Sequence, residues 1–459
     1  MYSLTEKYTD KVLETMKQMG KKVDYWDVRL GDSQKTRIFY RSKDLEQISF
    51  PKVFGGSVRV YGNGGWGLAT FTDIDGFKKA AKQAVESAVL FKKKKVIFSP
   101  IKPVKKVILS NDGRKDFLSI KTAEKIKLLN HYRDCIWREK TALIKSNISY
   151  FDSLSKKLFI SSEGSIIEQE IPRLRCSVYL TAKKNDGIQN YSKGLSFTNF
   201  KDLRDKDLRI KKAIGIVNSL VDAPPAKGGE YPVVIDGKLA GVFAHEAFGH
   251  LSEADSLIND PQLKKMMVKG SRFGNKNITI FDDPNAGSWG GYDYDDEGIS
   301  PQKVILLNRG ILQGRLHTRE TAAILDEEPN GHGRAGDVRS IPYPRMGTTC
   351  IKNGTLSQKD LISDIKHGYY CLGFMAGMTD YGNFTFTAMY GYEIVKGELK
   401  QMVRDIKISG NLFKTLNEIE GVGKDLEEVP GMCGKWGQTI PAGTIAPSLK
   451  LGKVLIMGV

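Results

Sequence analysis

The sequence predicts an α+β protein of two domains, an α/β N-terminal domain over residues 1–225 and a β-rich C-terminal domain over residues 226–459. A chain of 459 residues is too long for one ordinary hydrophobic core. The first half mixes helical and strand patterns, whereas the second half is rich in glycine and short strands. The Pro- and Gly-containing stretch APPAKGGE (223–230) separates the two halves and marks the expected boundary.

The first half opens with an amphipathic pattern over residues 3–19 that predicts a helix. Alternating segments at 23–31 and 35–50 predict paired strands, and SVRVYGNGGWGLATF (57–71) predicts two strands joined by a glycine-rich turn. A second helix is expected to open at Thr72 or Asp73, and further helices are expected within 119–140 and 203–223. Between the last two, an antiparallel meander is expected to turn near residues 153–156 and 163–164.

The second half carries short strand patterns, with helical patterns around 237–270 and 355–366. The strand patterns are YPVVID (231–236), NITIFDD (277–283), KVILLNRGILQG (303–314) and FTFTAMYGYEIVKGEL (384–399). An acidic run also lies in this half, and its spacing does not fit a calcium-binding loop. We therefore expect a solvated turn at its members Asp293, Asp295, Asp296 and Glu297.

The composition argues against a nucleic-acid-binding, membrane-spanning or disulfide-rich protein. The net charge is +17, but the lysines are spread along the chain with few aromatic residues among them, so we expect a solvated surface and no nucleic-acid partner. There is no signal-peptide pattern and no run of about 18 apolar residues, so we expect a cytoplasmic protein without a membrane partner. The five cysteines are odd in number and lack a CxxC pair, which argues against a disulfide framework.

The stretch GVFAHEAFGHLSEAD (241–255) carries the strongest chemical signal. Two of the six histidines, His245 and His250, flank Glu246, as in helical zinc motifs, but with one residue more between Glu and the second His. In an ideal α-helix, residues at i and i+5 are displaced by about 140° and cannot share one ion. We therefore predict a distortion at Phe248–Gly249, either a π-bulge or a helix end at Gly249.

A zinc site built on this stretch gives each residue a role. His245 and His250 would bind the ion, and Glu246 would take a proton from a water molecule acidified by the zinc. A catalytic zinc has three protein ligands, and the third could be Glu253, Asp255, another histidine or a distant cysteine. Spacing alone favours Glu253, three residues after His250.

The sequence resembles the TldD/PmbA family of zinc-dependent peptidases, once called modulators of DNA gyrase. The resemblance extends in order along nearly the whole chain. It is carried by RVYGNGGWGLATF (59–71), HEAFGHLSEAD (245–255), NGHGRAGDVRSIPYPRMGTTCIKNG (330–354), FTFTAMYGYEIVKGEL (384–399), ISGNLF (408–413) and GMCGKWGQTIPAGTIAPSLKLGKVLIMG (431–458).

The resemblance implies that Cys433, in GMCG, is the third zinc ligand in place of Glu253, which leaves structural roles for Cys135, Cys176, Cys350 and Cys371. It also implies a catalytic, TldD-type chain that forms a homodimer or a heterodimer with a PmbA-like subunit. The family fold has an α/β N-terminal domain and a β-rich C-terminal domain that holds the metal. Unfolded or short peptides would enter a cavity enclosed by the dimer, and backbone pairing to a sheet edge would bind them without sequence preference.

The polar segment 330–346 contributes three candidate substrate-binding residues, His332, Arg334 and Arg345. They could contact a substrate carboxylate or the oxyanion of the transition state. Hydrogen bonding within the loop, or a dimer contact, is the alternative. The sequence as a whole predicts a zinc metallopeptidase, and the alternative function is a non-catalytic, partner-binding subunit acting on a DNA-processing enzyme such as gyrase.

Overall fold

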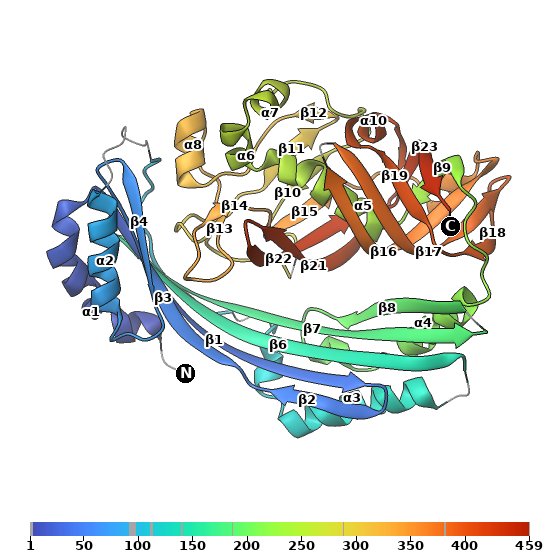
Figure 1. Cartoon of the computed structure of the whole chain (residues 1–459), viewed down its shortest axis with the longest axis horizontal. Coiled ribbons are helices and arrows are strands. Elements are labelled where there is room, and N and C mark those ends of the chain that lie inside the picture. Colours follow the sequence, from blue (N-terminus) through green and yellow to red (C-terminus); the bar gives the residue numbers. More distant parts are fainter. Residues whose placement is uncertain are drawn as a thin grey trace.

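The computed structural model describes residues 3–90, 98–110, 113–138, 141–185, 187–287, 289–380 and 382–458. It confirms the α+β class, with a β-rich C-terminal part (Figure 1). A long curved sheet from the first half of the chain lies along one side of the molecule, and the second half of the chain packs over it (Figure 1).

The N-terminal part is built on one eight-stranded sheet. Its strands are β1 (Tyr25–Arg41), β2 (Asp44–Ser49), β3 (Lys52–Gly62), β4 (Gly65–Phe71), β5 (Lys105–Ile108), β6 (Leu143–Ser161), β7 (Ile166–Lys184) and β8 (Gly187–Ser196). They lie in the order β4-β3-β1-β6-β7-β5, with β2 paired to β1 and β8 to β7. The three central strands have 17 to 19 residues each, so they extend along the whole N-terminal part.

Two helix pairs cover the two ends of this sheet (Figure 1). At one end, α1 (Leu4–Met19) and α2 (Phe77–Val89) pack on β3, β4 and the start of β1 in one hydrophobic core. At the other end, α3 (Thr122–Trp137) and α4 (Asp207–Leu220) form a second core with β6, β7 and β8. Short 3-10 turns lie at Gly20–Lys22, Asp116–Leu118 and Lys201–Leu203.

The predicted turn near residues 153–156 is wrong, because β6 continues through them and pairs with β1 on one side and β7 on the other. Ser153 and Ser155 suggested a turn, but they line a cavity between the two halves, where small polar side chains are accommodated within a strand. The predicted pairing of segment 23–31 with segment 35–50 is also wrong: residues 25–41 form one strand, β1, and residues 44–49 form β2, which pairs with the end of β1. The glycine-rich turn is confirmed: Asn63 and Gly64 join β3 to β4 with φ values of 51° and 81°.

The C-terminal part contains two larger sheets. One has the order β12-β11-β10-β15-β22-β21, and the other the order β16-β9-β23-β19-β17-β18, where an additional β16–β17 pairing closes a ring. The first comprises β10 (Ile280–Asp282), β11 (Val304–Asn308), β12 (Ile311–Leu312), β15 (Thr348–Ile351), β21 (Glu427–Lys435) and β22 (Gln438–Ala446). The second comprises β9 (Gly229–Ile235), β16 (His367–Asp380), β17 (Asn383–Val395), β18 (Glu398–Val403), β19 (Lys407–Asn411) and β23 (Leu449–Met457), with β20 (Ile419–Val422) paired to β23. A small pair is formed by β13 (Gly333–Arg334) and β14 (Tyr343–Pro344).

Helix α5 (Gly237–Ala244) lies between these two sheets and contacts β15, β16 and β22. Asp236 caps its first turn by accepting a hydrogen bond from the Leu239 amide, and almost all of its residues are apolar and buried. The other helices are α6 (Ala254–Asn259), α7 (Pro261–Met266), α8 (Arg319–Leu325), α9 (Gln358–Ile362) and α10 (Leu412–Asn417). The hydrophobic core around α5 starts at Ala226, and the domain division between residues 225 and 226 stays a prediction.

The acidic run is not the solvated turn that we predicted. Asp295, Asp296 and Glu297 are buried, and only Asp293 is exposed. The N-terminal sheet supplies their partners: Lys157 Nζ lies 2.8 Å from Asp296, and Arg59 Nη1 lies 2.9 Å from Glu297. These cations are more than 130 positions away in the sequence, so the local charge pattern could not reveal that the two halves meet here.

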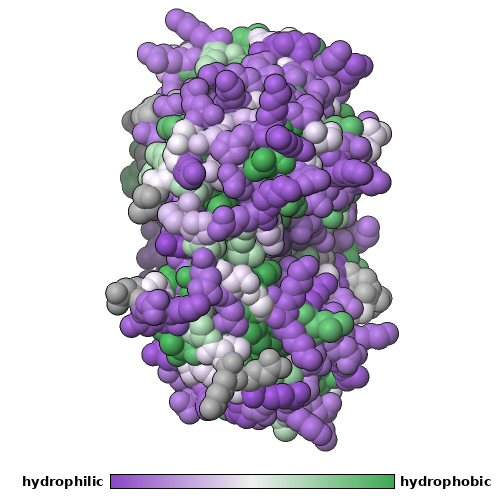
Figure 2. Space-filling view, turned by 90° about the vertical axis from the view of Figure 1, so that its right-hand side faces the viewer, coloured by the Kyte–Doolittle hydropathy of each residue, from purple (hydrophilic) through white to green (hydrophobic). Residues whose placement is uncertain are grey.

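Polar side chains predominate on the face at the right-hand end of Figure 1, where apolar side chains form only small separate groups (Figure 2). This agrees with a chain in which 27% of the residues are charged. Among the described residues, no helix has the length and apolar character needed to cross a bilayer.

Candidate metal centre

A π-turn follows α5 directly. Residues His245–Gly249 form a π-helix, in which the His250 amide donates to the His245 carbonyl, an i→i+5 hydrogen bond. A 3-10 turn over His250–Ser252 comes next. The predicted distortion is therefore present, in the form of the π-bulge. The alternative, a helix end that uses the conformational freedom of Gly249, is wrong, because Gly249 has ordinary helical angles (φ −58°, ψ −57°).

The π-turn brings the two histidines to the cysteine. The rings of His245 and His250 lie 5.1 Å apart between centroids. With Cys433 on β21, they place one nitrogen each and the sulfur within 4.8 Å of one another. Cys433 Sγ lies 3.5 Å from His250 Nε2, and the thiol is buried. Two nitrogens and one sulfur at this spacing form a three-donor cluster that could hold a metal ion.

Glu253 lies behind His250 rather than in the cluster. Its carboxylate is 2.9 Å from His250 Nδ1, which leaves Nε2 to face Cys433. Lys435 Nζ donates to Glu253 at 2.8 Å and to Asp255 at 2.7 Å. Spacing alone favoured Glu253 as the third ligand, but the structure gives it the position of a carboxylate that orients a candidate ligand, His250.

His245 is held by a chain of hydrogen bonds on the opposite side of the cluster. Thr349 Oγ1 donates to Asp282 at 3.1 Å and lies 3.3 Å from His245 Nδ1, so the hydroxyl accepts from the imidazole. Because Thr349 engages Nδ1, Nε2 is the nitrogen that His245 has left for the cluster. Burial raises the pKa of Asp282, but hydrogen bonds from His332, Gly347 and Thr349 outweigh it and hold the pKa below its usual value.

The charge state of Cys433 suits metal binding. Burial raises the pKa of the thiol, but hydrogen bonds from His245 and His250 outweigh burial and lower the pKa to about 5. Glu253 and the Cys433 sulfur in turn raise the pKa of His250 against the effect of burial. A proton is thus held between a thiolate and an imidazole, and the same position suits a metal cation.

A second group of possible ligands contains a cysteine that is protonated rather than a thiolate. His131, Cys135 and Asp207 also bring their donor atoms within 4.8 Å of one another. The Cys135 thiol donates to Asp207 at 3.0 Å, and burial together with that carboxylate raises the pKa of the thiol to about 11. Cys135 therefore stays protonated, as the structural role predicted for it requires.

Glu246 lies on the π-turn beside His245 and is half-buried. Thr379 Oγ1, on β16, donates to its carboxylate at 3.5 Å. Glu246 is not one of the clustered donors. Its position next to a candidate ligand, but outside the donor set, is compatible with a proton-transfer role.

The three residues predicted to bind substrate lie in different surroundings. His332 is fully buried, with Nε2 3.1 Å from Asp282 and Nδ1 3.0 Å from the Asn330 carbonyl. Arg345 is also fully buried and donates to the Cys433 carbonyl at 2.7 Å. These contacts reach Asp282 and Cys433, outside the segment 330–346, so the two residues support the donor cluster, and their predicted contact with substrate stays a prediction. Arg334 lines a cavity between the two halves of the chain.

Sequence reasoning missed Thr349, Asp282 and Lys435. Thr349 and Asp282 lie on neighbouring strands, β15 and β10, and reach His245 only through the pairing of those strands. Their local sequences carry no signal for this role. Lys435 follows the GMCG segment directly, and a lysine so close to a candidate thiolate ligand was a signal that could have been used.

Comparison with known proteins identifies the family. Three family models match successive parts of the chain: PmbA/TldA metallopeptidase domain 1 over residues 26–88, the central domain over 115–220 and the C-terminal domain over 228–458. The chain belongs to the PmbA/TldD metallopeptidase family. The resemblance that the sequence motifs indicated is thereby confirmed.

Related proteins agree with this assignment. A metalloprotease of Synechocystis is 36% identical, over 95% of this chain and 95% of the relative. A zinc metalloprotease TldD homolog of Saccharolobus solfataricus is 31% identical, over 91% of this chain and 93% of the relative. Two crystal structures share the fold. A proposed modulator of a DNA gyrase from Thermotoga maritima has a TM-score of 0.81 at 20% identity, covering 98% of this chain and 100% of that one. TldE from Thermococcus kodakarensis has a TM-score of 0.79 at 21% identity, covering 97% and 100%.

Proposed function

We propose that the protein is a zinc-dependent peptidase that hydrolyses short or unfolded peptides in the cytoplasm. The observation that carries the proposal is the i→i+5 turn, which brings two imidazoles of one helical segment to the buried thiolate of Cys433. Two nitrogens and one sulfur are donors that zinc accepts, and three protein ligands leave a fourth position open, as in catalytic sites. The name of the Saccharolobus relative, a zinc metalloprotease, supports the same metal.

His245, His250 and Cys433 would hold the ion. Glu253 and Thr349 fix the rings of the two histidines, so the donor atoms need no rearrangement to face a cation. A bound zinc ion supplies a Lewis acid for the peptide carbonyl and makes water more acidic.

Glu246 would carry out the proton transfers. Its carboxylate takes a proton from the attacking water and gives it to the amine that leaves when the peptide bond breaks. The Thr379 hydroxyl, which donates to the carboxylate at 3.5 Å, would help to hold it in one orientation.

We further propose that a dimer encloses the site, formed with a second copy of the chain or with a PmbA-like subunit. The support is the fold shared with TldE, a protein of the same family. The edge strand β21 is poorly suited to pair with an extended peptide. Two of its carbonyls, those of Gly431 and Cys433, already accept hydrogen bonds from Trp289 and Arg345, each at 2.7 Å.

A regulatory role without catalysis is the second candidate. It is favoured by the description of the Thermotoga structure as a proposed modulator of a DNA gyrase. The donor cluster argues against it, because two imidazole nitrogens and a thiolate within 4.8 Å of one another are the donor set of a metal site. A purely regulatory chain does not require that arrangement.

The test combines elemental analysis with cleavage of a fluorogenic, unstructured peptide. Wild-type protein should contain zinc and cleave the peptide. Glu246→Gln should keep the zinc and lose about 10²- to 10⁴-fold in rate, the usual contribution of general acid–base catalysis. Glu86→Gln, at an exposed position on α2, is the matched control and should cleave at the wild-type rate. Wild-type cleavage by Glu246→Gln would refute the role of Glu246, and wild-type protein without zinc and without cleavage, also with a PmbA-like partner, would refute the proposed function.

A further inference from the structure

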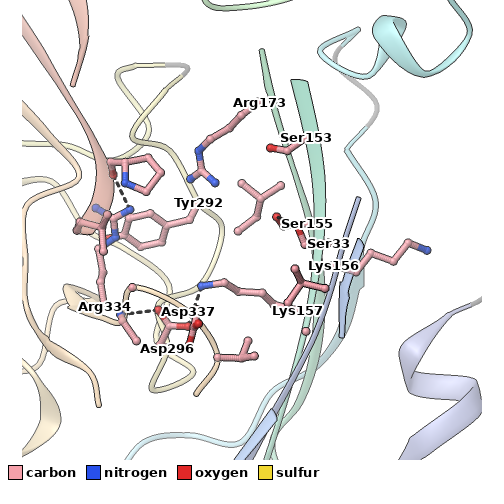
Figure 3. A pocket seen from close by; sticks show the side chains of 18 of the residues that line it. Ser33, Ser153, Ser155, Lys156, Lys157, Arg173, Tyr292, Asp296, Arg334 and Asp337 are labelled. Atoms are coloured by element: carbon pink, nitrogen blue, oxygen red, sulfur yellow. Dashed lines mark hydrogen bonds and ion pairs between the residues drawn. The ribbon is translucent and has the colours of Figure 1, made fainter. Parts of the chain in front are cut away.

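A cavity of about 590 Å³ lies between the N-terminal sheet and the C-terminal part (Figure 3). Strands β1, β6 and β7 form one wall, with the hydroxyl groups of Ser33, Ser153 and Ser155. The other wall comes from the loop around Tyr292, from the segment after β13, and from β22. Ile440 belongs to this wall and is the direct cross-strand partner of Cys433, so the cavity adjoins the strand pair that carries the donor cluster.

Lysine and arginine outnumber aspartate among the lining residues. Three of these cations have a carboxylate partner. Lys157 reaches across to Asp296 at 2.8 Å, as Figure 3 shows, Lys156 lies 3.4 Å from Glu170, and Arg339 is paired with Asp337 at 2.9 Å. The remaining cations are Arg173 and Arg334, which lie beside Tyr292, and Lys35, Arg37 and Arg175 on β1 and β7.

Arg173 and Arg334 approach the Tyr292 ring from two sides (Figure 3). The Arg334 guanidinium carbon lies 4.5 Å from the ring centroid, and its terminal nitrogens donate to the carbonyls of Met346 and Pro441. Arg173 Nε donates to the Trp289 carbonyl at 3.1 Å. Within the part of the chain that the structure describes, the terminal nitrogens of Arg173 have no protein acceptor, which leaves a planar pair of donors facing the cavity.

Arg334 is buried and Arg173 is half-buried. Apart from Arg334, the buried arginines each have a carboxylate oxygen within 4.0 Å: Arg29, Arg59, Arg315, Arg319 and Arg345. Among the described residues, neither Arg173 nor Arg334 has one. Burial, and next the positive charge of Arg334, lower the pKa of Arg173 to about 9. An anion between the two guanidinium groups would remove this repulsion.

We infer that Arg173 and Arg334 form a subsite for a carboxylate of the peptide substrate, either the C-terminal α-carboxylate or the side chain of an acidic residue. A guanidinium with two free terminal nitrogens matches the two oxygens of a carboxylate. Arg334 contributes its charge, since its terminal nitrogens are already bound. The inference rests on the proposed function and adds a substrate class to it: peptides that carry a carboxylate at a set place.

The test uses four fluorescent peptides of one neutral sequence: with a free C-terminus, with a C-terminal amide, and the amide form with one internal Glu or the matching Gln. Binding is measured by anisotropy with zinc-loaded Glu246→Gln protein, and cleavage with protein that has the wild-type Glu246. At least one carboxylate peptide should bind about tenfold or more tightly than its neutral partner, the usual contribution of a charge-assisted hydrogen bond. If the peptide with the free C-terminus binds more tightly than its amide, the subsite recognises the α-carboxylate. If the Glu peptide binds more tightly than the Gln peptide, it recognises an acidic side chain.

Arg173→Gln should abolish this preference, raise KM for the carboxylate peptide by about tenfold or more, and leave KM for the neutral peptide and kcat unchanged. Arg173→Lys, which keeps the charge but loses the paired donors, should retain part of the preference. Arg41→Gln, on the same sheet and paired with Glu46 outside the cavity, is the control and should retain it fully.

Equal binding of carboxylate and neutral peptides to the protein with native Arg173 overturns the inference, whether or not the Arg173 variants fold. Inorganic phosphate could bind at Arg173 while carboxylate peptides bind no more tightly than neutral ones. In that case the subsite belongs to a free anion, and the substrate assignment is wrong. Carboxylate preference in binding without cleavage of any peptide supports the subsite and refutes the proposed peptidase. The two failures are therefore distinguishable.

Discussion

Replacing Gly249 by alanine should destabilise the protein and loosen the donor cluster, because no methyl group fits at this position of the π-turn. A Cβ atom on Gly249 would lie 2.0 Å from Met346 Sδ and within 3.4 Å of two further atoms of the same side chain. Met346 is fully buried, and Arg334 binds its carbonyl, so the side chain cannot move into solvent. The methyl group must therefore displace the turn or the methionine.

The size of the effect follows from two opposing terms. Overpacking of a close-packed core costs about 1–3 kcal/mol. The backbone angles at Gly249 are helical, so alanine brings no strain and its better helix propensity offsets up to about 1 kcal/mol. We expect a net loss of about 1–2 kcal/mol in the free energy of unfolding. Because His250 is the next residue, zinc affinity should fall by about tenfold or more.

Urea denaturation measures the first effect, and competition with a chelator measures the second. Gly215→Ala is the matched control: Gly215 is an exposed glycine of α4 with no atom within 4 Å of a Cβ, so alanine there should stabilise the protein by up to about 1 kcal/mol. Met346→Ala alone should cost about 2–5 kcal/mol, and in the double variant the new methyl group should occupy part of the vacated space. Gly249→Ala with wild-type stability and wild-type zinc affinity would refute the reasoning.

Three further predictions concern the surroundings of the cluster and the stability of the fold. Thr349→Val removes the hydroxyl that holds His245 and should weaken zinc binding by about ten- to a hundredfold in chelator competition. Thr349→Ser, which keeps the hydroxyl, should keep most of the affinity. Equal zinc affinities of the two variants would contradict the role of the hydrogen bonds that link Asp282, Thr349 and His245. Cys433→Ser should reduce the zinc content found by elemental analysis, and an unchanged content would return Glu253 or Asp255 as the third ligand. Burial raises the pKa of Glu327, but hydrogen bonds from His317 and Lys269 and the charge of Arg315 outweigh burial and lower the pKa to about 2. These interactions should contribute about 3 kcal/mol at pH 7, and the contribution should be lost as the pH falls from about 4.3 toward 2. Urea denaturation should therefore show Glu327→Gln to be less stable than wild type at pH 7 and the difference to shrink at pH 3.5, and a difference independent of pH would show the predicted shift to be wrong.

The spacing of His245 and His250 by itself determined that the helix had to be distorted before both could face one ion. That conclusion depends only on helix geometry, which is the same in every protein. Which of the two distortions occurs depends on the tertiary structure around the helix. The structure has a π-turn with helical angles at Gly249, and the glycine is needed for the close approach of Met346, a residue almost a hundred positions away.

The sequence also determined the family and the α+β class, since both are written in local patterns or motifs. It did not determine the lengths of β1 and β6, which continue through the predicted breaks. Only the tertiary structure decided the environment of the polar residues. Glu253 became a support for His250, Asp296 and Glu297 became members of buried ion pairs, and Ser153 became a residue of a cavity wall. The physical reason is that burial, charge compensation and hydrogen bonding depend on residues distant in the chain, whereas periodicity and spacing report only the chain's own geometry.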